Sequence, residues 1–242
     1  MKMLRKFTIE QKALMLRILE ISHEARTSHL GSCLTAVDII NAIYKVKKKK
    51  EKFVLSNGHA GVALYVVLEK YGLIKNPNLK ELHVHPDRNK KLNIDASTGS
   101  LGQGLSIAVG LALANRRKNV YCSLSDGECA EGAIWEALRI ASEQKLSNLK
   151  VIINANGWAA YDPISVPLLI KRLSGFINKI NIVNGYDIKQ LEKSLRKPSG
   201  NYPLVLVAIT TVEILPFLKG QDAHYYVMTD EDFILAKELL GE

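Results

Sequence analysis

From residue 120 onward, short and almost wholly apolar runs alternate with amphipathic segments, and this alternation restricts the fold more than any other feature. The apolar runs, which predict strands, are 120–124, 150–154, 180–183 and 204–209. The segments that predict helices are 131–143, 188–195 and 231–240. Apolar strands that alternate with helices are typical of a parallel sheet covered on both faces. The sequence therefore predicts an α/β fold with a doubly wound, mostly parallel sheet.

The first half of the chain adds more helices and one more strand. Helical periodicity, with Thr8 as the first N-cap, covers 8–23, 34–46, 59–71 and 104–115, and 53–55 predicts a strand. Residues 72–100 predict an irregular loop, and loops of that length are usually either functional or disordered. Because no internal repeat or Gly/Ser-rich linker interrupts the pattern, we expect residues 1–242 to form a single domain.

Composition narrows the class of protein. Hydrophobic residues make up 47% of the 242 residues and charged residues 24%, which excludes a disordered or collagen-like chain. No apolar run approaches the ~20 residues of a membrane-spanning helix, so no membrane partner is expected. Glu10 and Lys12 interrupt any apolar core of a secretory signal. Three cysteines without CxxC spacing argue against disulfides or zinc and favour a cytoplasmic location.

The chain is basic, with 33 Lys and Arg against 24 Asp and Glu, which gives a net charge of +9. Part of the excess is local, in the lysine-rich segment 45–52. Such a run is usually a solvated loop, and it can also attract anionic metabolites. No nucleic-acid-binding motif accompanies the charge, so we expect no nucleic-acid partner.

Polar residues follow two of the predicted strands. Asp126-Gly127 comes after the strand 120–124, and Asn156-Gly157 comes after the next strand, one helical crossover later. Ligands of such sheets bind beyond the carboxyl ends of the strands. The Asp126 carboxylate, the Asn156 amide and the carbonyl of Trp158 offer the hard oxygen ligands that suit Mg²⁺. Taken singly, Asp-Gly and Asn-Gly are also ordinary turn dipeptides.

This pair of dipeptides resembles the diphosphate-binding motif of thiamine-diphosphate enzymes, although Ser125 stands where that motif usually has glycine. Six segments are similar to motifs of transketolases and occur in that family's order: 27–32 (TSHLGS), 55–60 (LSNGHA), 83–87 (HVHPD), 97–104 (STGSLGQG), 126–132 (DGECAEG) and 184–187 (NGYD). The resemblance covers roughly residues 10–190. It implies the thiamine-diphosphate-binding fold and, within it, the domain that binds the diphosphate.

The resemblance also implies a role for each matched residue. The catalytic residues would be His29, His59 and His85, which contact the sugar and transfer protons. The cofactor-binding residues would be His59, Gly99, Ser100, Leu101, Asp126, Gly127, Glu128, Asn156 and His224. Asp126, Asn156 and Trp158 would bind Mg²⁺, or Ca²⁺ or Mn²⁺ in its place. Glu131 would lie at a subunit interface. The segment 212–215 departs from the family, which often has Gly-Lys-Gly after its last strand.

By the same resemblance, the chain corresponds to the N-terminal subunit of a split transketolase. The partner would be a C-terminal subunit that carries the pyrimidine-binding half, in an α₂β₂ heterotetramer. The assembly would transfer a two-carbon ketol unit between sugar phosphates.

Other interpretations of the sequence stay open. One is a subunit of a biosynthetic, transketolase-like carboligase that acts on an unusual sugar. Another is a non-catalytic scaffold relative. Deoxyxylulose-phosphate synthases and the alpha subunits of 2-oxo-acid dehydrogenases share fewer of the six segments.

Overall fold

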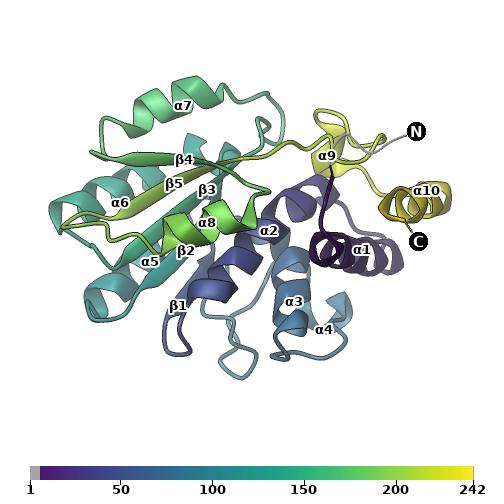
Figure 1. Cartoon of the computed structure of the whole chain (residues 1–242), viewed down its shortest axis with the longest axis horizontal. Coiled ribbons are helices and arrows are strands. Elements are labelled where there is room, and N and C mark those ends of the chain that lie inside the picture. Colours follow the sequence, from purple (N-terminus) through teal and green to yellow (C-terminus); the bar gives the residue numbers. More distant parts are fainter. Residues whose placement is uncertain (1–5, 242) are drawn as a thin grey trace.

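The computed structural model describes residues 6–241, and its centre is a five-stranded sheet in which every strand pairs in parallel (Figure 1). The strands are β1 (Lys52–Leu55), β2 (Val120–Ser125), β3 (Leu149–Ala155), β4 (Ile180–Asn184) and β5 (Leu204–Ile209). Their order in the sheet is β1-β2-β3-β5-β4. This confirms the predicted α/β fold with a parallel sheet.

Helices cover both faces of the sheet, and each face has its own apolar core. The longer helices are α1 (Ile9–Glu24), α2 (Leu30–Val46), α3 (Gly61–Lys70), α5 (Gln103–Ala114), α6 (Gly132–Glu143), α7 (Val166–Leu173), α8 (Ile188–Leu195) and α10 (Asp230–Leu240). Tyr121 and Ile152 pack with α2, α3 and α8, whereas Cys122 and Val151 pack with α5, α6 and α7. Successive strand residues therefore enter opposite cores, as a period of two requires.

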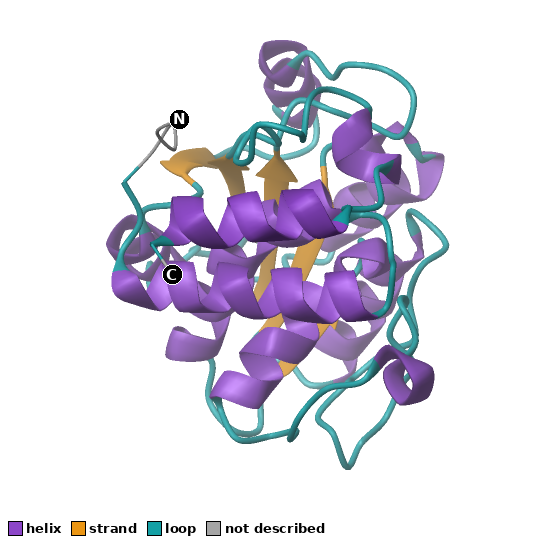
Figure 2. Cartoon of the chain, turned by 90° about the vertical axis from the view of Figure 1, so that its right-hand side faces the viewer, coloured by secondary structure: helices purple, strands orange, loops and turns teal. Residues whose placement is uncertain are grey.

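The amino-terminal helices form a layer outside the sheet. Figure 2 shows long helices lying in front of the strands on this side of the molecule. The helix α1 begins where predicted, because the Thr8 hydroxyl accepts from the Gln11 N–H at 3.3 Å and the Gln11 side chain accepts from the Thr8 N–H at 3.0 Å. This reciprocal capping box satisfies two N–H groups that the first helical turn leaves without partners.

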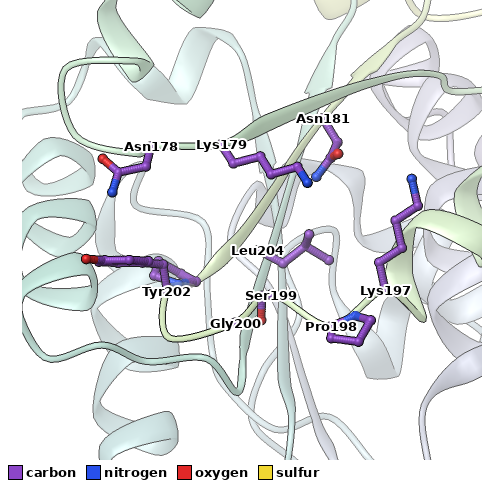
Figure 3. Close-up of a pocket in the computed structure, with 10 residues that line it drawn as sticks. Asn178, Lys179, Asn181, Lys197, Pro198, Ser199, Gly200, Tyr202 and Leu204 are labelled. Carbon is purple, nitrogen blue, oxygen red and sulfur yellow. The ribbon is translucent and has the colours of Figure 1, made fainter.

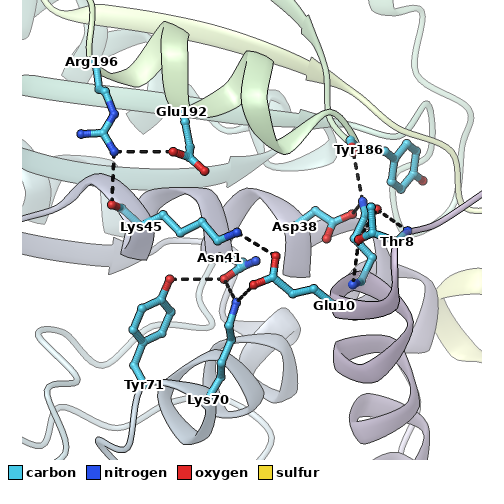
Figure 4. A network of polar contacts seen from close by, with 11 residues as sticks. Thr8, Glu10, Asp38, Asn41, Lys45, Lys70, Tyr71, Tyr186, Glu192 and Arg196 are labelled. Carbon is cyan, nitrogen blue, oxygen red and sulfur yellow. Dashed lines mark hydrogen bonds and ion pairs between the residues drawn. The ribbon is translucent and has the colours of Figure 1, made fainter.

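A polar network that is buried around Asp38 and partly exposed around Glu10 joins α1, α2 and α3 (Figure 4). Gln11 donates to the Asp38 carboxylate at 2.7 Å and to the carbonyl of Tyr186 at 3.0 Å. Lys45 and Lys70 both pair with the Glu10 carboxylate. Burial raises the pKa of Asp38 to about 7, against a partial opposing effect of the Gln11 hydrogen bond.

Several predicted boundaries were wrong. The second helix begins at Leu30 and not at residue 34, because His29 takes a left-handed conformation (φ 66°) directly before it. The predicted helix 59–71 is a 3₁₀ turn, Gly58–Ala60, followed by α3. Three helices were not predicted: α7 and the four-residue α4 (Leu79–Leu82) and α9 (Asp222–Tyr225). A helix of four residues is too short to show a hydrophobic period.

Residues 1–5, at the basic amino terminus, lie outside the described residues. Within residues 6–241, no helix combines the length and the apolar character that crossing a bilayer requires.

Candidate functional site

Four histidines from four separate segments gather on the side of the carboxyl ends of the strands. The ring centroid of His29 lies 5.4 Å from that of His59, 6.2 Å from that of His85 and 4.6 Å from that of His224. The rings of His59 and His224 are 5.3 Å apart. The structure thus brings together the three imidazoles expected to be catalytic, along with the fourth expected at the cofactor. Their roles stay predictions.

The backbone around His29 holds this cluster together. The His29 N–H donates to the carbonyl of His224 at 2.9 Å, which fixes the α9 segment against the start of α2. A Cβ at Gly31 would lie 2.6 Å from the Ala223 Cβ and 2.8 Å from its carbonyl oxygen. Only glycine permits this approach, and so the glycine of the TSHLGS segment accounts for the nearness of His224.

Burial sets the protonation of the cluster. It lowers the pKa of His29 to about 4 and that of His59 to about 3, and neighbouring imidazoles add smaller effects in the same direction. Burial also lowers the pKa of His224. These rings are therefore neutral at pH 7 and can each donate one hydrogen bond and accept another. The Nδ1 atom of His29 is buried and has no protein partner within the described residues, so it can serve a bound ligand.

Glycines also lock the loops of His59 and His85 together. A Cβ at Gly99, whose φ is +144°, would lie 2.8 Å from the His85 ring. A Cβ at Gly58 would lie 2.7 Å from the Gly99 nitrogen. The segments 55–60, 83–87 and 97–104, all singled out in the sequence, are thus packed directly against one another.

Asp126 lies at the end of β2, beside the end of β3. The strands pair in register, with Ser125 opposite Asn154, as the sequence predicted for neighbouring strands. The carboxylate of Asp126 is 1% exposed. It accepts from the Gly157 N–H at 2.7 Å and from the Gly127 N–H at 3.0 Å. Burial raises the pKa of Asp126 to about 7, and these backbone hydrogen bonds partly oppose the rise.

The loop after β3 faces Asp126 with neutral oxygens. The Asn156 side-chain oxygen accepts from the Trp158 N–H at 2.9 Å, which closes a local turn and leaves one lone pair. Within residues 6–241, no donor reaches the carbonyl oxygen of Trp158. That oxygen lies 3.7 Å from the position of a Cβ at Gly127. A Cβ there would also lie 3.0 Å from the Ala159 Cα, so Gly127 permits the close approach of the two loops.

This donor set fits a divalent cation. It consists of one buried carboxylate, one side-chain amide oxygen and one backbone carbonyl, all of them hard ligands of the kind that Mg²⁺ prefers. A cation would also compensate the cost of burying the Asp126 charge. The described residues contain no group of three or more His, Cys, Asp or Glu side chains arranged around one metal position.

The N–H groups of the turn after Asp126 have partners within the protein. Glu128 N–H donates to the Ser125 hydroxyl at 3.1 Å, and Gly127 N–H donates to the Asp126 carboxylate. Ser125, the departure from the family motif, thus caps the 3₁₀ turn Gly127–Ala130. The Glu128 carboxylate is fully buried and accepts from the Ser56 hydroxyl at 2.5 Å and the Gly102 N–H at 2.8 Å.

Glu128 therefore connects three of the predicted segments. Through Ser56 it joins the His59 loop, and through Gly102 it joins the 97–104 loop. Burial raises its pKa, against partial opposition from these hydrogen bonds. Both hydrogen bonds end on Oε1, and within the described residues the buried Oε2 has no partner. The expected contact of Glu128 with the cofactor stays a prediction.

The remaining predicted residues lie at the solvent side of the same loops. Ser100 and Leu101 are exposed, and Leu101 is 37% exposed despite its apolar side chain. Glu131 is exposed at the N-cap position of α6, and a Cβ at Gly102 would lie 2.8 Å from its Cβ. The divergent segment 212–215 places Val212, Ile214 and Leu215 in the core.

The structure adds supporting residues that sequence reasoning missed. Asn154 is buried below the site, donates to the Thr35 hydroxyl at 2.9 Å and accepts from the Thr210 hydroxyl at 2.6 Å. These bonds join β3 to α2 and to the end of β5. A polar residue inside an otherwise apolar strand was the available signal, because buried polar groups require partners.

Comparison with solved structures shows which known proteins share this fold. The chain superimposes on transketolase from Campylobacter jejuni with a TM-score of 0.81 and 24% identity, over 96% of this chain and 42% of that one. A variant transketolase from Pichia stipitis gives a TM-score of 0.83 and 22% identity, over 97% and 41%. These likenesses establish the shared fold.

Sequence comparison establishes the family. The human transketolase is 32% identical over 212 residues, which are 77% of this chain and 34% of that protein. A protein from Phocaeicola vulgatus, named as one of the subunits of apulose-4-phosphate transketolase, is 31% identical over 222 residues, which are 81% of this chain and 79% of that protein. The chain spans about a third of the full-length transketolases it matches. Residues 9–162 match the family model described as "Transketolase, thiamine diphosphate binding domain". Together, these matches show that the chain belongs to the transketolase family, in the region of its thiamine diphosphate binding domain.

Proposed function

We propose that the chain binds thiamine diphosphate through Mg²⁺ at the carboxyl edge of the sheet. With a pyrimidine-binding partner, it would transfer a two-carbon ketol unit from a ketose phosphate to an aldose phosphate. The observation that supports this best is the convergence of four imidazoles on loops that Glu128 and Ser56 tie to the Asp126 turn. A non-catalytic relative has no need to retain both halves of this arrangement.

Two groups of residues divide the work in this proposal. Asp126, Asn156 and the carbonyl of Trp158 hold the metal and, through it, the diphosphate. His29, His59 and His85 exchange protons with the hydroxyl and carbonyl oxygens of the sugar, because imidazole can both accept and donate a hydrogen bond. When bound, the cofactor supplies the nucleophilic carbon that the ketol transfer requires.

The partner follows from the same proposal. Ser100, Leu101 and Glu131 lie exposed at the rim of the loops, where a second subunit can cover the cofactor. We propose a C-terminal transketolase subunit in this place, in an α₂β₂ assembly with two-fold symmetry, in the cytoplasm. The relatives from Phocaeicola vulgatus and Actinobacillus succinogenes are each named as one of several subunits of a transketolase, and this naming supports a divided enzyme.

The cofactor assignment is tested with one substitution and one control. Asp126→Ala removes the only carboxylate of the proposed metal set, and we expect it to abolish Mg²⁺-dependent binding of thiamine diphosphate in calorimetric titration. Glu238→Ala removes an exposed carboxylate on α10 and should leave binding unchanged. Circular dichroism confirms that both variants are folded. Equal cofactor affinity in the Asp126→Ala variant and the wild type would exclude the assignment.

A second candidate differs only in the substrate. Two relatives are named as subunits of apulose-4-phosphate transketolases, one of them 27% identical over 242 residues and covered to 88%. This naming favours a specialised sugar phosphate over the common substrates. Steady-state rates of the reconstituted complex with apulose 4-phosphate and with unbranched ketose phosphates decide between the two. A higher kcat/KM for the unbranched sugars would reject the specialised function.

A further inference from the structure

A cavity of about 330 Å³ lies at the amino ends of the strands, on the side of the sheet away from the proposed cofactor loops. Figure 3 shows the residues that line it. It is formed by two turns, 178–181 and 197–204, which lead into β4 and β5. These strands are parallel neighbours, with Ile180 opposite Val205. The cavity therefore lies at the amino ends of the strands, whereas Asp126 follows a carboxyl end.

The lining of this cavity is positively charged. It includes Lys179 and Lys197 and contains no carboxylate. Both lysines are exposed, and within residues 6–241 neither ammonium has an ion-pair partner. In Figure 3 the Lys179 side chain extends toward Asn181, and the Lys197 side chain lies on the other side of Leu204. Two unpaired ammonium groups and an amide are suitable donors for a phosphate.

A third lysine stands behind the wall of the cavity. Lys150 is 6% exposed, and its ammonium donates to the Ser199 hydroxyl at 3.2 Å. Ser199, which lines the cavity, donates in turn to the carbonyl of Ser147 at 2.7 Å. Lys150 thus lies close to the cavity. Burial lowers the pKa of its ammonium group, and the charge of the buried Glu51 partly opposes this shift.

Besides Asn178, Asn181 and Ser199, the lining has an apolar part. Tyr202 is 39% exposed, and Pro198, Pro203 and Leu204 continue its surface. A flat aromatic side chain beside cationic groups suits a ligand with a ring and a phosphate. The volume, at the lower end of the ~300–1,000 Å³ range of small-molecule sites, fits a molecule the size of a nucleotide or sugar phosphate.

Other basic residues at the amino ends of the strands add to the positive electrostatic potential around the cavity. Other turns that enter strands at these ends carry the lysines of 47–50 and the basic run 116–118. In a parallel sheet all these turns lie at the same edge. Their summed positive potential raises the local concentration of anions.

We propose that this cavity binds a small, ring-bearing phosphate ester, with the phosphate between Lys179 and Lys197 and the ring against Tyr202. The site is separate from the thiamine diphosphate loops, and the proposal does not rest on the proposed function. In this proposal, part of the net positive charge of the chain serves to bind a phosphate group.

The test uses the intact chain and two matched double variants. One variant, Lys179→Ala/Lys197→Ala, removes the cavity lysines. The other, Lys171→Ala/Lys189→Ala, removes two exposed lysines of α7 and α8 outside the lining. Both lose the same charge. Adenosine 5′-monophosphate, ribose 5-phosphate, adenosine and ribose are titrated by calorimetry, with thiamine diphosphate and Mg²⁺ in excess to fill the other site.

We expect at least one phosphate ester to bind, its unphosphorylated counterpart not to bind, and the cavity variant to lose affinity about 10-fold or more. The control variant should stay within about 2-fold of the wild type. Equal losses in the two variants would indicate diffuse surface charge and overturn the proposal. Absence of binding by both esters, or equal binding of adenosine and its phosphate, would also overturn it. The outcome is independent of the proposed function, because a chain that fails to bind thiamine diphosphate can still bind, or fail to bind, the phosphate esters in this cavity.

Discussion

At the scale of single residues, two buried aspartates show how surroundings decide what a carboxyl group does. Asp38 and Asp126 are almost equally buried, and burial raises the pKa of each to about 7. Asp38 accepts from the Gln11 side chain, and within residues 6–241 its Oδ1 has no partner. Asp126 accepts from N–H groups of two strand-end loops, beside a Trp158 carbonyl oxygen that no donor of those residues reaches. These surroundings favour a structural role for Asp38 and a ligand-binding role for Asp126.

The raised pKa of Asp38 predicts a pH-dependent stability. The folded chain holds this proton up to about pH 7, whereas an unfolded aspartate releases it near pH ~4. The folded state thus binds more protons between these values, and the free energy of unfolding falls as the pH rises from about 4 to 7. Asp38→Asn keeps an oxygen for Gln11 and removes the titration. We expect its urea-unfolding midpoint, relative to wild type, to rise between pH 5 and pH 8.

Asp126 contributes with the same sign in the metal-free chain, so the comparison of the variant with the wild type isolates Asp38. Parallel pH profiles for the two proteins would contradict the prediction.

Gly31 carries a second residue-scale prediction. Gly31→Ala places a methyl group 2.6 Å from the Ala223 Cβ and 2.8 Å from its carbonyl oxygen, so the backbone of α9 must move. Overpacking of this kind costs ~1–3 kcal/mol. It also displaces His224 from His29, and affinity for thiamine diphosphate should fall. Thermal unfolding and calorimetric titration measure the two effects.

The control for this variant is Gly110→Ala. Gly110 is exposed in the middle of α5, with open space where a Cβ would be placed. Alanine there should stabilise the chain by ~0.5–1 kcal/mol. If Gly31→Ala behaved like this control, the close packing of α9 on α2 would not hold the site.

At the scale of elements, the sequence predicts helices and strands that have a periodic hydrophobic pattern. It does not predict boundaries that depend on a single side-chain contact or backbone conformation. The strands could be predicted because their apolar runs enter two cores, and α1 because Thr8 and Gln11 form a capping box. The start of α2 could not, because it depends on the left-handed backbone of His29. The hydrogen bond from the Glu128 N–H to the Ser125 hydroxyl, in the turn after Asp126, could not be predicted either. Such contacts depend on side-chain geometry and have no periodic signal.

The link between the β1 loop and the turn after β2 gives a prediction at this scale. Ser56→Ala removes the hydroxyl that donates to Glu128 and leaves a buried carboxylate with the Gly102 N–H as its remaining donor to Oε1. Loss of one partner of a buried charged group costs ~1–3 kcal/mol or more. We expect a lower urea midpoint and weaker cofactor binding. Ser147→Ala, at an exposed serine before β3 and away from the proposed cofactor loops, should change neither.

At the scale of the whole molecule, the carboxyl ends and the amino ends of the strands differ in the charge of the side chains around them. The carboxyl edge gathers neutral imidazoles and Asp126, and the amino edge gathers lysines around a cavity. The sequence motifs predicted which residues gather at the carboxyl ends, because six segments occur in the order of the transketolase family. They could not predict which gather at the amino ends, because Lys150, Lys179 and Lys197 come from three separate parts of the chain that only the sheet brings together.

The exposed face of α5 carries the last prediction. Ile107 is 37% exposed and Leu113 is 39% exposed, and α5 follows the loop that holds exposed Leu101. Exposed apolar side chains mark interaction surfaces, and the surface that holds Ile107 belongs to the helix that begins beside the proposed cofactor loops. Ile107→Glu places a charge in it and should weaken binding of the pyrimidine-binding subunit at least ~10-fold. Ile234→Glu is the control, because Ile234 is 58% exposed on α10, and the variant should assemble normally. Sedimentation velocity of each variant mixed with the partner measures assembly, and ketol transfer should be lost in step with it. Normal assembly of the Ile107→Glu variant would place the partner on another face of the chain.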